Sequence, residues 1–251
     1  MNTKTIYKLT IAYDGTNYNG WQAQDDVPTI TNTLQNRFKK IFNQDVTIVG
    51  SSRTDAGVHA NGQMAIARTN LEIEPKKLIF AWNNLLPKDI LIKSLEVANP
   101  EFHPMINVRQ KIYFYDFCLK RPDPFNYRYV WFFHDPINIE KLKECLKIFV
   151  GIHDFRSFCT GPEIKDTVRK IDDISLEYIP EKEIYRIIIK GKSFLRYMIR
   201  RIVGACIEVA SKENLQINDL TKALEQKTPV QLLPNAPAQG LLLDTISYEG
   251  D

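Results

Sequence analysis

The apolar residues of this chain follow strand and helix patterns in mixed order, and that order limits the folds open to it. Over residues 7–13, large apolar side chains alternate with smaller or polar ones, which is the period of a half-buried strand. Over residues 30–42, apolar side chains instead recur at helical spacing, and lysines stand near the end, where cations suit the helix dipole. A short buried strand at 46–49 then leads into the polar segment 51–62.

The rest of the chain repeats this mixture. The predicted helices span 74–86, 138–150 and 193–210, and the predicted strands span 90–96, 111–119, 171–179 and 184–190. Strands that follow strands favour the α+β class, with a mixed or antiparallel sheet and helices on one face. We expect two similar α/β lobes, residues 1–106 and 107–251, whose strands form one extended sheet. We expect the active site in a cleft between the lobes, because such clefts commonly hold ligands.

Length and composition are those of an ordinary globular protein. With 251 residues, of which 44% are hydrophobic and 25% charged, the chain can bury a sizeable core. Its formal net charge is only +3, so any affinity for nucleic acid must come from local basic patches. The strand pattern starts at once, which leaves no room for a signal peptide, and no run of about 18 apolar residues occurs. We therefore expect a cytoplasmic protein without membrane contact.

The cysteines give no sign of a metal site. They lie far apart in the sequence without a Cys-x-x-Cys pair, which argues against zinc binding and against a disulfide framework. We expect reduced and mostly buried thiols, and no bound metal. The four residues are Cys118, Cys145, Cys159 and Cys206.

The densest polar segment is the loop of residues 51–59, which follows a predicted strand. Within it, Asp55 stands between Arg53 and two small residues. A neighbouring cation favours the charged carboxylate, and small residues leave space for a substrate. Taken alone, however, Asp-Ala-Gly is more simply a turn, in which the Asp accepts backbone N–H bonds and the Gly takes a positive φ. In that interpretation Arg53 is a surface partner and His59 a structural hydrogen bonder.

The string Arg-Thr-Asp-Ala-Gly-Val-His-Ala (53–60) resembles the signature of the TruA family of tRNA pseudouridine synthases. Eight matching consecutive residues are hard to obtain by accident. Further segments resemble family segments in the same order, so the resemblance covers nearly the whole chain. They are AYDGTNYNGWQAQ (12–24), Lys-Ile-Tyr-Phe-Tyr (111–115), Asp-Phe-Arg-Ser-Phe (154–158), SFLRYMIRRIVG (193–204) and Gly-Leu-Leu-Leu (240–243).

The resemblance implies that Asp55 is the nucleophile of an enzyme that isomerises uridine to pseudouridine in tRNA, at positions 38–40 of the anticodon stem-loop. The N-glycosidic bond breaks, the base turns within the site, and its C5 joins the ribose, without a metal or an organic cofactor. A carboxylate can hold the ribose or the base covalently meanwhile, as in retaining glycosidases. Whether Asp55 adds to the base, attacks C1′ or assists removal of a ribose proton is left open.

Two more catalytic residues follow from the resemblance. Arg200 matches the family arginine that pairs with the nucleophile, and on a helix of 193–210 it lies opposite an apolar stripe. Tyr113 matches the family tyrosine beside the active site, where a ring can stack on an extruded uracil and a hydroxyl can relay a proton. Without the resemblance, Arg200 fits a solvated basic face and Tyr113 a strand core. Tyr115 and Phe117, on the same strand face, are interpreted as core.

The implied partner is tRNA, lying across the cleft on basic side chains and bound through backbone and shape more than base edges. A uridine paired in a duplex must be flipped out before its C5 can react. Because family members are homodimers, the resemblance also implies a homodimer. The residues expected to contact the substrate are Arg53, Thr54, His59, Lys192, Arg196 and Arg201, with Lys190 as a further candidate. A solvated surface charge is an equal alternative for Arg196 and Arg201.

Two departures from the family pattern bear on the substrate. Ile30 and Thr31 stand where the family usually has a Val-Gln pair, and Met105 stands where it usually has an arginine near the cleft. They leave room for a diverged paralogue that acts on other tRNA or RNA uridines. Two other function classes compete with the synthase: a catalytically silent RNA-binding module, and an N-glycosidase that releases the base outright.

Overall fold

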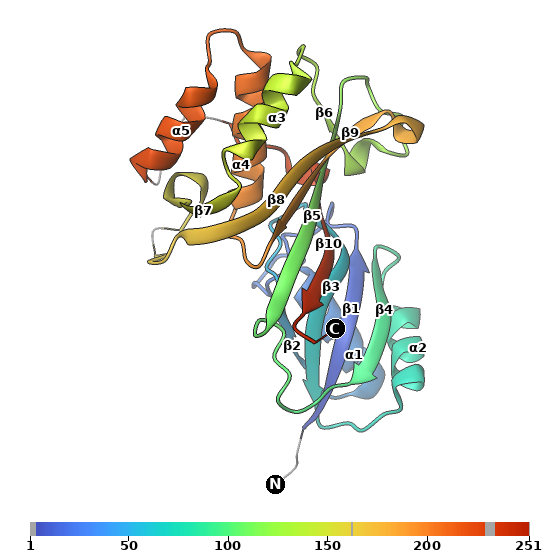
Figure 1. Cartoon of the computed structure of the whole chain (residues 1–251). Helices are drawn as coiled ribbons and strands as arrows, with labels where there is room; N and C mark the ends of the chain where they lie inside the picture. The colour runs from blue at the N-terminus through green and yellow to red at the C-terminus, as the bar shows by residue number, and fades with distance from the viewer. Residues whose placement is uncertain (1–3, 162, 229–233, 251) are drawn as a thin grey trace. The chain divides into compact units, whose positions relative to one another are not determined.

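The computed structural model describes residues 4–161, 163–228 and 234–250 (Figure 1). The chain divides into two compact units: unit 1 comprises Met1–Arg109 with Leu243–Asp251, and unit 2 comprises Gln110–Leu242. It passes from unit 1 to unit 2 within strand β5 (Val108–Cys118) and returns within strand β10 (Leu241–Tyr248). The sequence suggested a division after residue 106, and the contacts place the first change at Arg109.

The fold is of the α+β class that the order of apolar patterns predicts. Within the described residues, ten strands belong to one hydrogen-bonded sheet and five α-helices accompany them. The sheet is mixed because β6 (Trp131–Phe132) pairs with β5 in parallel, whereas most other neighbouring strands pair antiparallel. No α-helix in the described part of the chain is long and apolar enough to cross a membrane.

Unit 1 is built around the central strand β1 (Thr5–Tyr13), which pairs antiparallel with β3 (His59–Thr69) and with β4 (Ile90–Val97). Strand β2 (Thr47–Gly50) pairs with β3, and β10 lies next to β3. Along β1 the buried positions alternate with half-exposed ones. The strand predicted over 7–13 is therefore confirmed.

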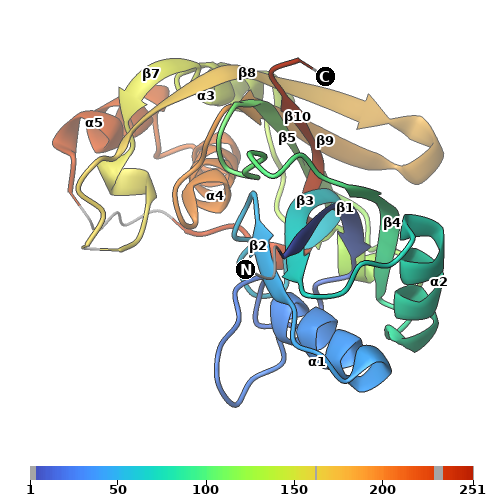
Figure 2. The same cartoon turned by 90° about the horizontal axis from the view of Figure 1, so that it is seen from below.

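Helices α1 (Ile30–Phe42) and α2 (Pro75–Leu85) lie side by side on one face of the unit 1 strands (Figure 2). The Phe38 ring meets the Trp82 ring edge-on at 4.9 Å, and both side chains are fully buried. The Trp82 indole N–H donates to the Leu34 carbonyl at 3.1 Å. The apolar spacing that predicted these helices thus corresponds to the face that forms the core of unit 1.

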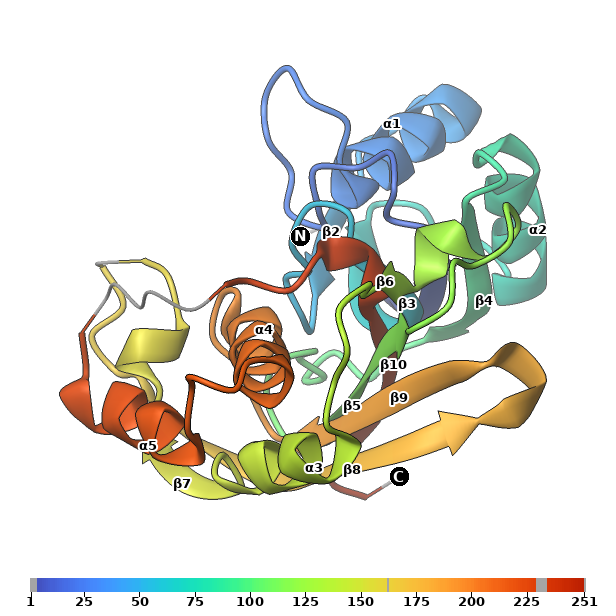
Figure 3. The same ribbon diagram turned by 90° about the horizontal axis from the view of Figure 1, so that it is seen from above.

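Unit 2 contains the antiparallel strands β5, β9 (Ile184–Gly191), β8 (Val168–Ile179) and β7 (Gly151–Asp154), in that order. Helices α3 (Ile139–Lys147), α4 (Met198–Ser211) and α5 (Ile217–Gln226) lie together on one face of β7–β9 (Figure 3). Most of α4 is buried, which makes it the central helix of this unit.

The structure corrects several predicted boundaries. The helix predicted over 193–210 begins only at Met198, because Tyr197 takes a left-handed φ of 62° that helix-forming residues do not adopt. Strand β3 already begins at His59, inside the segment predicted as a polar loop. The sequence prediction missed α5, β6 and β7, and it assigned no strand to the residues of β3. The segment LLPNAPAQG (232–240), whose composition predicts a loop before a final strand, lies partly outside the described residues.

The prediction of buried thiols is confirmed, since all four cysteines are buried, with their sulfurs free. Burial raises the pKa of the Cys206 thiol well above its ordinary value, and the pKa of Cys145 is raised to about 11. Raised thiol pKa values keep these cysteines in the protonated, unreactive form.

Candidate functional site

The loop that carries Asp55 is fixed where it leaves β2 and where it enters β3. The Ser51 backbone N–H donates to the Met64 carbonyl at 2.8 Å. The buried Gln63 side chain spans the base of the loop: its amide donates to the Ser52 carbonyl at 2.7 Å, and its oxygen accepts from the Ser52 N–H at 3.2 Å. The loop is therefore a rigid support for the residues at its tip.

Asp55 opens the turn at that tip. The Val58 backbone N–H donates to the Asp55 carbonyl at 3.2 Å, and Gly57 has a φ of 78°, which suits glycine. The Asp55 side chain is half-buried, whereas its neighbours Arg53 and Ala56 are exposed. The turn interpretation of Asp-Ala-Gly is thus correct for the backbone, and it leaves the carboxylate partly accessible.

The N-terminal loop of residues 14–21 packs directly against the Asp55 loop. The Trp21 N–H donates to the Thr54 carbonyl at 3.1 Å, and the Gly57 N–H donates to the Tyr18 carbonyl at 3.1 Å. Glycine is needed at two of these positions. A Cβ at residue 15 would lie 2.0 Å from the Val58 carbonyl oxygen, and a Cβ at residue 20 would lie 2.5 Å from the Thr54 carbonyl oxygen.

Thr54 and His59, predicted as substrate contacts, are both buried within unit 1. The Thr54 hydroxyl bonds the Tyr13 hydroxyl at 2.8 Å. The His59 Nδ1 accepts from the Gly15 backbone N–H at 3.0 Å, and an Asp14 carboxylate oxygen lies 3.1 Å from the same nitrogen. These contacts hold the N-terminal loop and the Asp55 loop together, which is the structural role that the sequence left as the alternative for His59.

Tyr113 and Tyr115 lie on one face of β5 in unit 2, and both are buried. The Tyr113 ring meets the Phe194 ring edge-on at 5.3 Å. The Tyr115 hydroxyl donates to the Pro237 carbonyl at 2.8 Å, and its side chain is fully buried, so its interpretation as core is confirmed. Burial raises the pKa of Tyr115 well above its ordinary value, and the positive charge of Arg200 opposes this rise.

Arg200 is held in place at the start of α4. Its Nε donates to the Ala236 carbonyl at 2.8 Å, and its own carbonyl accepts from the Ala236 N–H at 3.0 Å. Its guanidinium carbon lies 5.2 Å from the centre of the Tyr197 ring, which places it for a cation–π contact. Arg200 is therefore a half-buried and oriented cation rather than a loosely solvated one.

The other basic residues predicted to contact the substrate differ in their surroundings. Arg196 precedes α4 instead of lying on it; its side chain is exposed, and its guanidinium lies 5.3 Å from the Tyr197 ring centre. Arg201 is half-buried and donates to the Ser157 carbonyl at 3.3 Å. Lys192 is exposed, as is Arg53 in unit 1. Arg53, Lys192 and Arg196 thus have exposed side chains, whereas Arg201 is tied to unit 2.

Lys111 is a residue to which the sequence prediction gave no role. It is the first residue of the Lys-Ile-Tyr-Phe-Tyr segment, lies on the same face of β5 as Tyr113, and is buried. Burial lowers the pKa of its ammonium group from 10.5 to about 8. The alternation of this strand could have identified it, because Lys111, Tyr113 and Tyr115 are spaced two residues apart.

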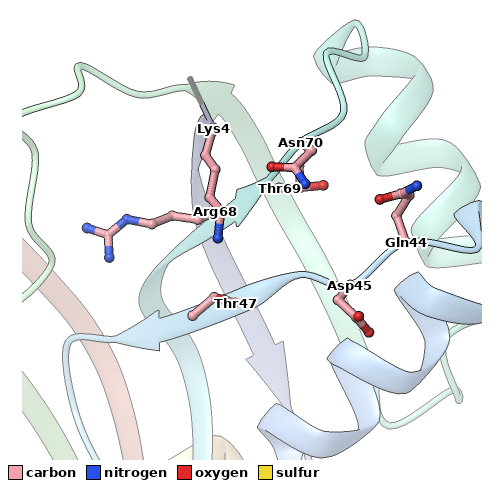
Figure 4. Close-up of a pocket in the computed structure, with 7 residues that line it drawn as sticks. All are labelled: Lys4, Gln44, Asp45, Thr47, Arg68, Thr69 and Asn70. Atoms are coloured by element: carbon pink, nitrogen blue, oxygen red, sulfur yellow. The ribbon is translucent and has the colours of Figure 1, made fainter. Parts of the chain in front are cut away.

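A small polar pocket of about 130 Å³ lies at the opposite end of β3 from the Asp55 loop (Figure 4). Its lining residues are Lys4, Gln44, Asp45, Thr47, Arg68, Thr69 and Asn70. In Figure 4 the Arg68 guanidinium points away from Asp45. None of the predicted site residues lines this pocket.

A family model and individual relatives of known type both match this chain, and they name the same family. The sequence model of a family described as tRNA pseudouridine synthase matches residues 9–104 and 146–249. The chain is 35% identical to tRNA pseudouridine synthase A of Thermodesulfovibrio yellowstonii, over 96% of this chain and 98% of that one. It is 37% identical to tRNA pseudouridine synthase A 1 of Protochlamydia amoebophila, over 98% and 97%. It is 34% identical to tRNA pseudouridine synthase A of Aquifex aeolicus, over 96% and 98%.

These matches run through the Asp55 loop, the N-terminal loop packed on it and helix α4 with Arg200. The chain therefore belongs to the TruA-type tRNA pseudouridine synthases, a family of isomerases that convert uridines of tRNA into pseudouridine.

Proposed function

We propose that this protein forms pseudouridine at positions 38–40 of the tRNA anticodon stem-loop, with Asp55 as the nucleophile. The observation that carries the proposal is the presentation of Asp55. Its carboxylate is half-exposed at the tip of a loop that is hydrogen-bonded to β3 and to the N-terminal loop. A reactive group on a rigid support keeps its geometry as the substrate binds, and such preorganisation lowers the barrier.

The reaction needs no atoms beyond those of the substrate. The bond between C1′ and N1 breaks, the freed uracil rotates, and a bond forms between C1′ and C5. The hydrogen on C5 leaves as a proton, and N1 gains one. A carboxylate can stabilise the separated ribose or base by a transient covalent bond, and this is the role that we assign to Asp55.

Arg200 and Tyr113 complete the proposed site. Arg200 is an oriented cation suited to pair with the Asp55 carboxylate and favour its charged form. Tyr113 offers an aromatic ring for a flipped uracil and a hydroxyl for proton transfer. Asp55 belongs to unit 1 and the other two to unit 2, so the proposal draws its catalytic groups from both units.

The tRNA would be bound chiefly through its phosphates. Arg53, Lys192 and Arg196 have exposed side chains suited to that task, and Arg201 contributes a further positive charge in unit 2. Thr54 and His59 would act on the substrate indirectly, by holding the Asp55 loop. The proposal includes a homodimer, as the family implies, and a cytoplasmic site of action.

Incubation of the chain with unmodified tRNA that carries tritium at uridine C5 tests this function. We expect tritium release and pseudouridine at positions 38, 39 or 40 in the digested product. Free uracil would instead show an N-glycosidase, and modification at other positions would show a diverged paralogue. Binding of tRNA without any tritium release would show a silent RNA-binding module and overturn the proposal.

A further inference from the structure

Residues 120–130 of unit 2, here called the aromatic loop, expose aromatic side chains between β5 and β6. The exposed fraction is 88% for Phe125, 48% for Tyr127 and 47% for Tyr129. Large apolar side chains that gather at one exposed place commonly mark contact with a partner. None of these three residues has a part in the proposed chemistry.

The aromatic loop is held by its own hydrogen bonds. The Asp123 carboxylate accepts from the Phe125 N–H at 2.7 Å and from the Asn126 amide at 2.8 Å. The Gln239 amide donates to the Tyr127 carbonyl at 3.2 Å and to the Val130 carbonyl at 3.0 Å. Because the backbone around Phe125 is already fixed, its ring loses little freedom when a partner binds.

The far end of the loop is anchored in the interior of unit 2. Val130 is buried in a small cluster with Cys118 and Ile184. The next residue, Trp131, meets the Tyr115 ring edge-on at 6.2 Å. The exposed rings are thus attached to the same strand that carries Tyr113.

The charge of the loop indicates the kind of partner. It contains three cations, Lys120, Arg121 and Arg128, and one anion, Asp123. Lys120 is paired with Glu183, so the net charge at this surface is +1 when Glu183 is counted. The Arg128 guanidinium carbon lies 5.7 Å from the Tyr127 ring centre, and its Nε donates to the Tyr127 hydroxyl at 3.1 Å. Aromatic rings interleaved with guanidinium groups fit a partner that combines flat rings with negative charge, as unpaired nucleotides do.

A second copy of this chain fits the loop less well. If two copies met with this loop on their two-fold axis, each loop would face its own counterpart. Arg121 and Arg128 of one copy would then lie near the same residues of the other, and like charges across an interface oppose association.

We propose that the aromatic loop is a stacking surface for unpaired bases of RNA, with a base on the Phe125 ring and phosphates beside Arg121 and Arg128. The inference rests on the proposed function for the identity of the RNA, which is tRNA. It adds a binding surface that lies outside the catalytic residues.

The test measures the affinity of the full chain for unmodified tRNA by fluorescence anisotropy over a range of salt concentrations. We expect Phe125→Ala and Phe125→Leu to weaken binding about tenfold, and Phe125→Trp to bind as the wild type does, because stacking needs an aromatic ring. The salt dependence should stay unchanged in these variants, whereas Arg128→Gln should reduce its slope by about one. The matched control is Ile152→Ala in β7, an apolar residue that is 69% exposed in the same unit and should bind normally.

Two results would overturn the stacking surface. One is wild-type affinity in Phe125→Ala or in Phe125→Leu. The other is a lower mass of the RNA-free Phe125→Ala protein in sedimentation with RNA affinity unchanged, which would assign the loop to an interface between copies. Tritium release by the wild type distinguishes a failure of the stacking surface from a failure of the proposed reaction. Release without any effect of Phe125 removes the stacking surface alone, and an effect of Phe125 without release removes the proposed reaction alone.

Discussion

At the scale of single residues, the packing of the Asp55 loop depends on two positions that have no room for a Cβ atom. Gly15 and Gly20 let the N-terminal loop approach the backbone of the Asp55 loop more closely than any side chain would permit. The hydrogen bonds from Trp21 to Thr54 and from Gly57 to Tyr18 form only at that distance. The two glycines therefore position the carboxylate without touching a substrate.

We expect Gly15→Ala to destabilise the protein by about 2–3 kcal/mol, because the new Cβ would lie 2.0 Å from the Val58 carbonyl oxygen and the loops must separate. Urea unfolding gives this difference in the free energy of unfolding. Tritium release should fall as well, since Asp55 loses its support. Glu72→Ala, an exposed change in the same unit but outside the Asp55 loop, is the control and should leave both quantities near those of the wild type. A Gly15→Ala protein of normal stability would show that the loops do not pack in this way.

Because Lys111 is buried, we expect the stability of the protein to change with pH in the alkaline range. Burial lowers its folded-state pKa to about 8, below the ordinary 10.5, so the unfolded state binds more protons between these pH values. Stability therefore rises with pH across that window, and the penalty for burying the charge is fully present below pH 8. Lys111→Met removes the penalty. We expect the variant to be more stable than the wild type at pH 7, by up to about 3 kcal/mol.

The measurement compares the free energies of unfolding of Lys111→Met and the wild type at pH 7 and at pH 10.5. The difference should shrink at the higher pH, where Lys111 is neutral in the folded protein and partly neutral in the unfolded one. Other titrating groups are common to both proteins and cancel. A difference that stays constant from pH 7 to pH 10.5 would contradict the lowered pKa.

The sequence was sufficient to predict which residues belong to the candidate site, but not which groups surround them. The eight-residue string pointed to Asp55, and its neighbours suggested substrate contacts for Thr54 and His59. In the structure both side chains face partners 41 and 44 positions away in the sequence, Tyr13 and Gly15. Local spacing carries no information on such distant contacts, so the structural role offered as an alternative for His59 named no partner, and none was foreseen for Thr54. Lys111 was missed because a lysine in a strand pattern is ordinarily a solvent-facing residue.

At the scale of elements, helix α1 links the fold to the Asp55 loop. Its first backbone N–H groups donate to the Gly20 and Trp21 carbonyls, both at 3.1 Å, so the N-terminal loop satisfies the start of the helix. The Thr29 hydroxyl accepts from the Asn32 N–H at 3.2 Å and completes the cap. The position of α1 and the position of the N-terminal loop are therefore coupled.

The cap of α1 gives the prediction at this scale. We expect Thr29→Ala to lower the free energy of unfolding by about 1 kcal/mol, because it removes an N-cap acceptor at a fully buried position. Thr29→Ser keeps the hydroxyl and should retain most of that stability. Urea unfolding of the two variants side by side measures the difference, and equal losses would assign the effect to the missing methyl group instead of the cap.

Element types were predictable where apolar periodicity reflects burial, as in β1, α1 and α2. The start of α4 was not. Phe194 and Leu195 continue the apolar stripe of α4, yet they belong to a turn closed by the Met198 N–H donating to the Leu195 carbonyl at 3.1 Å. Leu195 is buried and Phe194 is half-buried, so their apolar character reflects packing within unit 2 and not a place in the helix. The missed helix α5 did carry a signal, since Gln216 and Asp219 form a capping box ahead of Leu220 and Leu224.

At the scale of the whole molecule, the proposed catalytic residues come from both units, Asp55 from unit 1 and Arg200 from unit 2. Arg200→Met keeps the length and much of the volume of the side chain but removes its charge. We expect a folded protein whose single-turnover rate of tritium release is reduced at least about a hundredfold, with circular dichroism and tRNA affinity as controls. An unchanged single-turnover rate would remove Arg200 from the active site.

The most direct test of the central claim is the single-turnover rate of tritium release by Asp55→Asn at saturating tRNA. Asparagine preserves the size of the side chain and removes the nucleophilic charge, so we expect the rate to fall at least about a thousandfold while the fold and tRNA binding persist. Asp45→Asn, an exposed aspartate of unit 1 paired only with Lys39 among the described ion pairs, is the matched control and should react as the wild type does. Tritium release by Asp55→Asn at the rate of that control would contradict the assignment of Asp55 as the nucleophile.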